Sequence, residues 1–316
     1  MSTRPASVNR RRVPALLLLV LLAGAPLLGL SGCGSKQGRP SVVVTTNILG
    51  DITRNIVGGE AEVTVLMRTD ADPHSFGVSA PQAASLEQAD LVVYNGLGLE
   101  ENVLRHVEAA EEAGVPTLAV GDTVDPVTYA AGESAGESDP HFWTDPERIR
   151  KAVGLIADQV TEHVRGADGA VVAENATAYG AQVTELTAWM RKQFGSIPSE
   201  RRQLVTNHHV FGYLAQRFGF RIVGAVIPGG TTLASPSASD LKSLATAIET
   251  AGVRTVFADS SQPDRLAQVL KRESDIEVDV VPLFSESLTA KGKGAATYLE
   301  MMRANTRAIS KGLGTE

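Results

Sequence analysis

Six histidines occur in the chain, and three of them follow predicted strands in loops. His74 comes after a strand at 63–66, His208 directly follows a strand at 203–206, and His141 lies in a loop between them. Loops at the carboxyl ends of parallel strands present side chains to a common crevice, so these imidazoles could lie close together. A solvated or capping role is the alternative for each histidine taken alone, because their spacing matches no short metal motif.

A carboxylate is expected to complete this set of possible ligands. Glu286 follows the last predicted strand, at 278–281, and would lie in the corresponding loop of the second half of the chain. Three imidazoles from one crevice would suit Zn²⁺, Mn²⁺ or a similar ion. With one carboxylate they would fill a tetrahedral shell around Zn²⁺ and leave no position for an activated water. Such a site favours metal binding over catalysis.

Two series of strands and helices would position these residues, because strand and helix alternate in each half of the chain. The first series has strands at 42–44, 63–66, 91–94 and 117–120, with helices at 48–57, 81–89 and 101–113. The second has strands at 203–206, 221–226, 255–258 and 278–281, with helices at 210–218, 239–251, 263–273 and 294–312. Alternation of this kind predicts parallel sheets covered by helices.

Between the two series lie helices predicted at 147–164 and 169–194, the second of which would be about 40 Å long. We therefore predict an α/β protein with two lobes, each with a central parallel sheet flanked by helices, joined by one long rigid linking helix. The expected divisions are a signal peptide at 1–32, a lipidated cysteine and tether at 33–40, an N-terminal lobe at 41–166, the linking helix at 167–196 and a C-terminal lobe at 197–316.

The first residues of the chain read as an export signal and not as part of the fold. Arginines at 10–12 precede an apolar run at 13–30, and Leu30-Ser31-Gly32-Cys33 forms a lipobox. The run contains two prolines and is too short for a good transmembrane helix. Cys33 is the only cysteine, which excludes disulfides within the chain and predicts that this residue carries lipid on the extracytoplasmic face of the cell membrane. The arginines leave both general and twin-arginine export open.

The charge of the chain bears on its partners. The formal net charge is −7, and removal of an arginine-rich leader without acidic residues makes the remainder more acidic. An acidic surface argues against nucleic acid as a partner.

Four segments resemble, in order, the signature segments of the zinc- or manganese-binding solute-binding lipoproteins of bacterial ABC importers, the cluster A-I or ZnuA/TroA-like family. They are DPHSF at 72–76, ADLVVYNGLGLE at 89–100, DPHFWTDP at 139–146 and TNHHVFGYL at 206–214. The resemblance extends over about 42–313. It implies a monomeric metal-binding protein without enzymatic activity that delivers its ion to a permease and an ATPase on separate chains.

The resemblance also implies which residues bind the ion: His74, His141, His208 and Glu286. Two positions depart from the family pattern, because the residue after the third histidine is usually acidic and the last ligand is usually aspartate. His209 and Asp259 are therefore alternative ligands. Zn²⁺ is expected from the histidine-rich set, and Mn²⁺ is the alternative because oxygen donors suit it.

Three other classes of function remain open from the residues: a zinc hydrolase, a binding protein for an organic solute, and a surface adhesin.

Around the predicted site, three aspartates either accept hydrogen bonds from imidazole N–H groups or cap turns, and Trp143 either lines the site or packs in the core. The aspartates are Asp72, Asp139 and Asp145.

Overall fold

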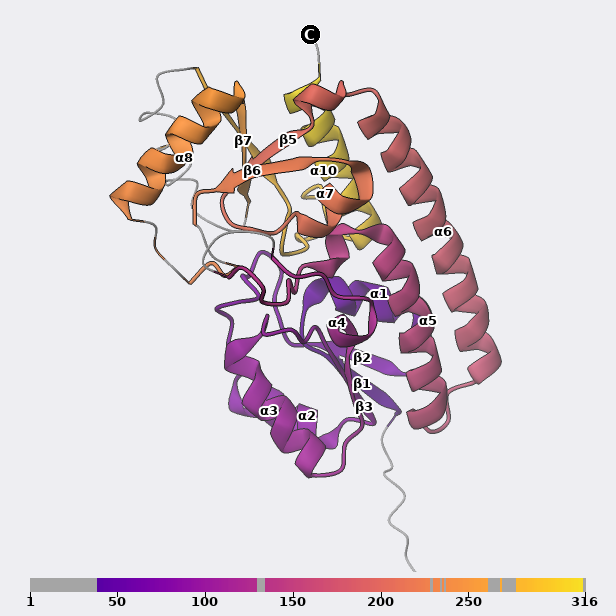
Figure 1. The fold of residues 1–316 in the computed structure, drawn as a ribbon. Coiled ribbons are helices and arrows are strands. Elements are labelled where there is room, and N and C mark those ends of the chain that lie inside the picture. Colours follow the sequence, from indigo (N-terminus) through magenta and orange to yellow (C-terminus); the bar gives the residue numbers. More distant parts are fainter. Residues whose placement is uncertain are drawn as a thin grey trace, which may run out of the picture. The chain divides into compact units, whose positions relative to one another are not determined.

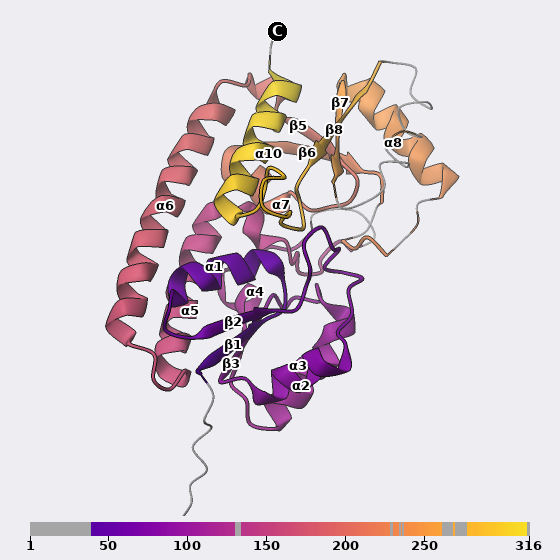
Figure 2. The same cartoon turned by 180° about the vertical axis from the view of Figure 1, so that it is seen from behind.

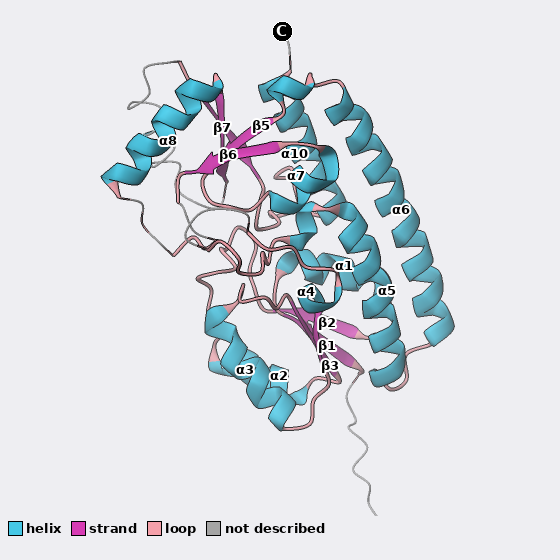
Figure 3. Ribbon diagram, viewed as in Figure 1, coloured by secondary structure: helices cyan, strands magenta, loops and turns pink. Residues whose placement is uncertain are grey.

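Two four-stranded sheets form the centres of two lobes in a computed structural model of the chain (Figure 1, Figure 3). The structure describes residues 39–314 apart from 130–133, 228–229, 234, 236, 261–267 and 269–276. The N-terminal lobe contains β1 (Ser41–Val44), β2 (Glu62–Val65), β3 (Leu91–Tyr94) and β4 (Thr117–Ala119). The C-terminal lobe contains β5 (Gln203–Thr206), β6 (Arg221–Ala225), β7 (Thr255–Asp259) and β8 (Asp279–Leu283).

Both sheets are parallel and have the same strand order, β2-β1-β3-β4 in one lobe and β6-β5-β7-β8 in the other. In each lobe the chain passes from the first strand to a neighbour on one side and then returns to the other side. This arrangement creates a switch point at the carboxyl end of the first strand, where loops diverge and side chains can converge on a ligand. Residues 42–44 of β1 are buried valines, as expected for a strand covered on both faces.

Helices cover both sheets (Figure 1, Figure 2). They are α1 (Asn47–Val57), α2 (Ala80–Gln88), α3 (Glu101–Glu112), α4 (Val120–Thr123), α5 (Pro146–His163), α6 (Gly169–Gly195), α7 (Gly212–Phe218), α8 (Ala238–Ala251) and α10 (Tyr298–Leu313), with short 3-10 helices at Phe142–Thr144 and Ser199–Arg201. The sequence explains several of their starts. Ser79 and Gln82 form a capping box at α2, and the Asp145 side chain accepts a hydrogen bond from the Glu147 amide at α5.

The long helix α6 packs against both lobes. It contacts α1 and α5 of the N-terminal lobe and α10 of the C-terminal lobe. Its buried side chains recur every three or four residues, which places them on one face: they include Tyr179, Val183, Leu186, Met190 and Phe194. One continuous cluster of buried apolar side chains includes residues from β1, α6 and α10, so the two lobes share part of their core.

The two-lobed α/β fold predicted from the sequence is confirmed, with shifts at some element ends. The strand expected at 117–120 ends at Ala119 because the chain turns into α4, and α10 begins at Tyr298 instead of residue 294. The helix expected at 263–273 lies outside the described residues apart from Gln268, and so do the leader and Cys33. Among the described helices, none combines the length and the apolar character needed to cross a membrane.

Candidate metal site

The loop after β2 brings His74 into the space between the lobes. Oδ1 of Asp72 accepts a hydrogen bond from the His74 backbone amide at 2.9 Å. This bond closes a local turn that fixes the backbone of His74. Oδ2 of Asp72 accepts from the hydroxyl groups of Ser75 and Thr232. Asp72 therefore shapes the turn and does not contact the imidazole ring through these bonds.

His141 is held through both its backbone and its ring by Asp139. Oδ1 of Asp139 lies 2.9 Å from the His141 amide and 2.8 Å from Nδ1 of the ring. In the neutral ring this contact places the proton on Nδ1 and leaves the lone pair of Nε2 directed away from Asp139. Trp143 lies edge-on to the same ring, with centroids 5.2 Å apart, and donates from Nε1 to the Ser285 carbonyl at 2.8 Å. The indole therefore lines the site and also joins the two lobes.

His208 enters the site from the end of β5. The Thr206 hydroxyl donates to the His208 carbonyl at 2.6 Å and so supports the backbone directly after the strand. Nε2 of His208 lies 3.0 Å from Oε1 of Glu286. Nδ1 is buried and makes no hydrogen bond with any described residue.

The loop after β8 supplies Glu286. Its neighbour Ser285 donates from both its amide and its hydroxyl to Oδ2 of Asp259. The side chain of Asn305 bonds both the amide and the carbonyl of Phe284, at 2.9 and 2.8 Å. Glu286 is thereby held against the remainder of its lobe.

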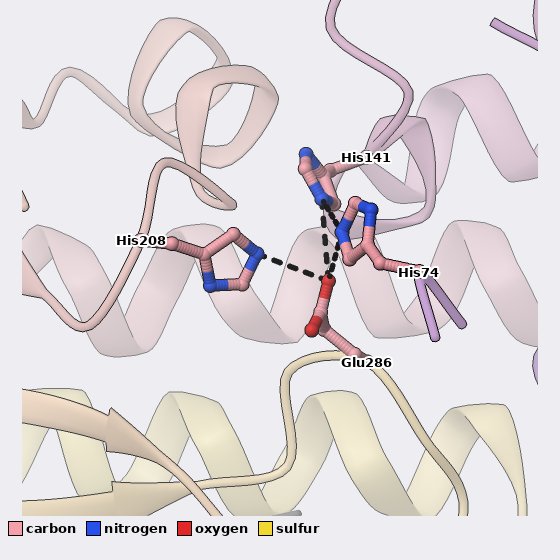
Figure 4. Close-up of side chains that lie close together, drawn as sticks. All are labelled: His74, His141, His208 and Glu286. Atoms are coloured by element: carbon pink, nitrogen blue, oxygen red, sulfur yellow. Dashed lines mark hydrogen bonds and ion pairs between the residues drawn. The ribbon is translucent and has the colours of Figure 1, made fainter. Parts of the chain in front are cut away.

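These four side chains converge on one small region (Figure 4). His74, His141, His208 and Glu286 are at most 3 % exposed, and one possible ligand atom from each lies within 4.8 Å of all the others. Oε1 of Glu286 is 3.1, 3.3 and 3.0 Å from Nε2 of His74, His141 and His208. Nε2 of His74 is also 3.3 Å from Nε2 of His141.

This geometry fits a divalent cation of the size of zinc. With zinc–ligand distances of about 2.0–2.1 Å, a tetrahedral shell places neighbouring ligand atoms about 3.3 Å apart. Oε2 of Glu286 is buried without a hydrogen-bond partner among the described residues, so it could become a second oxygen ligand. The donor set, three ring nitrogens and one carboxylate, suits Zn²⁺ and tolerates related ions.

The electrostatics of the site also favour a cation. Burial would raise the pKa of Glu286, but the adjacent His208 and His74 and the hydrogen bond to His141 hold that pKa well below its usual value. Burial would lower the pKa of His141, but its bonds to Asp139 and Glu286 raise the pKa to about 9. The site therefore contains an ionised carboxylate whose negative charge is balanced by the proton on His141 or by a metal ion.

The two alternative ligands are placed outside this group. His209 lines a cavity of about 670 Å³ and lies beside Tyr129, with ring centroids 6.3 Å apart. Burial and the neighbouring His208 lower its pKa. Asp259 bonds Ser285 and so supports the Glu286 loop from behind.

The three aspartates singled out in the sequence have different partners. Asp139 contacts the His141 ring, Asp72 accepts hydrogen bonds in the turn of His74, and Asp145 both caps α5 and forms ion pairs with Arg148 and Arg217. The sequence interpretation missed Asn47, whose side chain bonds the Glu286 loop. Its position soon after β1 was the available signal, because this is also a strand end beside the switch point.

Comparison with known proteins adds a relationship over most of the chain. Residues 42–312 match the family model described as "Zinc-uptake complex component A periplasmic". The zinc-binding protein TroA of Treponema pallidum is 29 % identical over 306 residues, covering 96 % of this chain and 98 % of TroA. The solved structure of that periplasmic zinc-binding protein superimposes with a TM-score of 0.80 at 29 % identity, covering 88 % of this chain and all of the solved chain.

Two further relatives have names that refer to metals. The metal ABC transporter substrate-binding lipoprotein SsaB of Streptococcus sanguinis is 30 % identical over 307 residues, covering 94 % of this chain and 97 % of SsaB. The manganese-binding lipoprotein MntA of Halalkalibacterium halodurans is 28 % identical over 291 residues, with 90 % and 94 % of the two chains covered. The similarity therefore spans nearly the whole of each relative.

Proposed function

Because the chain belongs to the family of periplasmic component A proteins of zinc-uptake complexes, we propose that it captures one Zn²⁺ between its lobes and delivers the ion to an ABC importer. The ligands in this proposal are His74, His141, His208 and Glu286. The observation that carries it is the convergence of three Nε2 atoms on one carboxylate oxygen in a buried site. Four protein ligands leave no position for a metal-activated water, which suits transport and not hydrolysis.

The choice between zinc and manganese depends on the oxygen content of the site. Three nitrogen donors favour Zn²⁺, whereas a bidentate Glu286 would add an oxygen and bring the site closer to the preference of Mn²⁺. Relatives of both kinds are similar to this chain. We propose zinc because only one of the four ligand residues supplies oxygen.

Metal analysis tests the proposal. Protein without tag histidines is dialysed against equimolar Zn²⁺ and Mn²⁺ and analysed by inductively coupled plasma mass spectrometry, beside a His74→Ala, His208→Ala double variant. We expect one equivalent of zinc in the parent and little in the variant. If neither protein holds metal, the proposal fails.

The variant Glu286→Gln distinguishes a zinc-transport protein from a zinc hydrolase. A metal-binding transport protein loses zinc affinity in this variant, whereas a hydrolase that uses Glu286 as its base would keep the metal and lose turnover. An organic solute would appear instead as a small molecule in native mass spectra that chelators do not remove.

The proposal also covers the membrane anchor, the oligomeric state and the division of the chain into lobes. We propose that the protein is a monomer anchored to the extracytoplasmic face of the membrane by lipid on Cys33, with the permease and ATPase on other chains. We retain 41–166 and 197–316 as the lobes and 167–196 as the linking helix. Cys33→Ala should move the protein from the membrane fraction to the soluble fraction, and an unchanged distribution would contradict the anchor.

A further inference from the structure

The side chain of Asn47 uses both ends of its amide group near the site. Nδ2 donates to the Arg68 carbonyl at 2.9 Å and to the Ser287 hydroxyl at 2.8 Å, and Oδ1 accepts from the Leu288 amide at 2.9 Å. Asn47 is 7 % exposed and begins α1. The preceding residue, Thr46, caps this helix, so the side-chain amide group of Asn47 is available for contacts outside the helix.

These hydrogen bonds join two loops that carry proposed ligands. Arg68 lies in the segment that leads from β2 to His74, whereas Ser287 and Leu288 directly follow Glu286. The Asp70 amide adds a second link between the same loops, because it donates to the Leu288 carbonyl at 3.0 Å. Asn47 thus fixes the spacing of two loops from different lobes.

Glu286 lies between attachments to both lobes. On its amino-terminal side, Phe284 and Ser285 are bonded by Asn305 and Asp259 of the C-terminal lobe. On its carboxyl-terminal side, residues 287 and 288 are bonded by Asn47 of the N-terminal lobe. A displacement of one lobe against the other therefore changes the position of Glu286 relative to the histidines.

We propose that Asn47 is a positioning residue that sets Glu286 against His74 and thereby controls how long the bound ion is retained. The inference rests on the proposed metal-binding function. Metal–ligand distances in proteins vary by only about 0.2 Å, so a small shift of the carboxylate weakens its bond to the ion. Residues that orient metal ligands typically change affinity by about 10–100-fold when they are substituted.

The test measures zinc release from full-length protein in detergent micelles. Zinc-loaded protein is mixed with an excess of a chromogenic chelator in a stopped-flow instrument. We expect Asn47→Ala to release zinc about 10–100-fold faster than the parent. The matched control is Asn175→Ala on α6, which also removes an asparagine hydrogen bond, to the Ile56 carbonyl at 3.2 Å. Ile56 is near the end of α1, whereas Asn47 is at its start. This control should release zinc at the parent rate.

A double variant shows whether Asn47 acts through Glu286. In a Glu286→Ala background, the additional Asn47→Ala substitution should leave the release rate unchanged, because the carboxylate that it positions is absent. The visible absorption spectrum of Co²⁺-loaded protein gives a second readout. It should change in Asn47→Ala, since the geometry at the carboxylate changes, and remain unchanged in Asn175→Ala.

Ser287→Ala provides a milder variant if Asn47→Ala does not fold. It removes one hydrogen bond of Asn47 and should speed release about fivefold, as expected for one neutral hydrogen bond. Parent-like release from either folded variant, or an equal effect of Asn47→Ala with and without Glu286, would overturn the role of Asn47. Failure of the parent itself to bind zinc would instead overturn the proposed function.

Discussion

His141 and His208 approach Glu286 from different lobes, and their second ring nitrogens have different surroundings. Nδ1 of His141 lies 2.8 Å from Asp139, whereas Nδ1 of His208 is buried and bonds none of the residues that the structure describes. The N-terminal lobe therefore adds a carboxylate partner for the second nitrogen of its ring, whereas the C-terminal lobe bonds the His208 ring through Nε2, to Glu286. The orientation of the His141 ring therefore depends on Asp139 as well as on Glu286, whereas that of His208 depends on Glu286 and on the packing around the ring.

The largest loss of zinc affinity should come from removing the ring of His141 or of His208, because each substitution removes a proposed ligand. His141→Ala and His208→Ala should each lower zinc affinity by more than about 100-fold, because the loss of a ligand exceeds the loss of a residue that orients one. Competition titration with a chelator of known affinity measures the change. Parent-like affinity in one variant would show that its histidine is not a ligand.

Asp139→Asn should sharpen the comparison, because it removes the charge that orients His141 and leaves His208 unaltered. We expect a loss of zinc affinity of about 10–100-fold. Asp72→Asn is the control: Asp72 contacts the backbone of His74 and should cost less affinity. An equal loss in both variants would mean that turn geometry, and not ring orientation, controls the site.

Proton release should depend on the same aspartate. The pKa of His141 is raised to about 9, so its ring is protonated in the metal-free protein at neutral pH and must lose a proton to bind zinc. Zinc affinity should therefore fall by up to about tenfold per pH unit below 9 for each displaced proton. Calorimetry in two buffers of different ionisation enthalpy counts these protons. We expect fewer protons released at pH 7.5 from Asp139→Asn, and no proton release from the parent would contradict the raised pKa.

The smallest expected effect is on the thermal stability of the metal-free protein and its dependence on pH. A raised pKa means that protonated His141 stabilises the folded state fully below its unfolded pKa of about 6.5, and this contribution disappears as pH rises through about 9. In the presence of chelator, Tm should fall over that range by about 2–4 °C for each kcal/mol lost. Differential scanning fluorimetry should show a shallower fall for Asp139→Asn. The same slope in both proteins would assign the change to other groups.

Part of this site could be predicted from the sequence, because the position of a residue just after a strand can be recognised from the neighbouring residues alone. His74, His208 and Glu286 lie in the loops after β2, β5 and β8, and the ends of such strands are where these folds collect side chains. His141 lies farther along the chain, after β4 and α4. The strands themselves were predictable because buried runs such as residues 42–44 lack alternation. The later start of α10 depends on Thr297, which accepts a hydrogen bond from the Glu300 amide, a capping signal that the apolar pattern does not contain.

The contacts between the lobes were beyond the sequence. Asn47 and Ser287 are 240 residues apart, and their hydrogen bond depends on how the two sheets are held by α6. His208 and His209 are adjacent and chemically identical, and the family resemblance, not their position after the strand, singled out His208; the path of the chain after β5 places this residue beside Glu286. Strand-end position identifies candidates, but tertiary packing selects among them.

Binding of zinc by His74, His141, His208 and Glu286 can be observed directly in a crystal structure of the zinc-loaded protein, with anomalous data collected on both sides of the zinc absorption edge. We expect one strong anomalous peak between the lobes, about 2.0–2.1 Å from Nε2 of each of the three histidines and from a carboxylate oxygen of Glu286. A peak bound by other residues, or zinc scattered over surface carboxylates with none between the lobes, would contradict it.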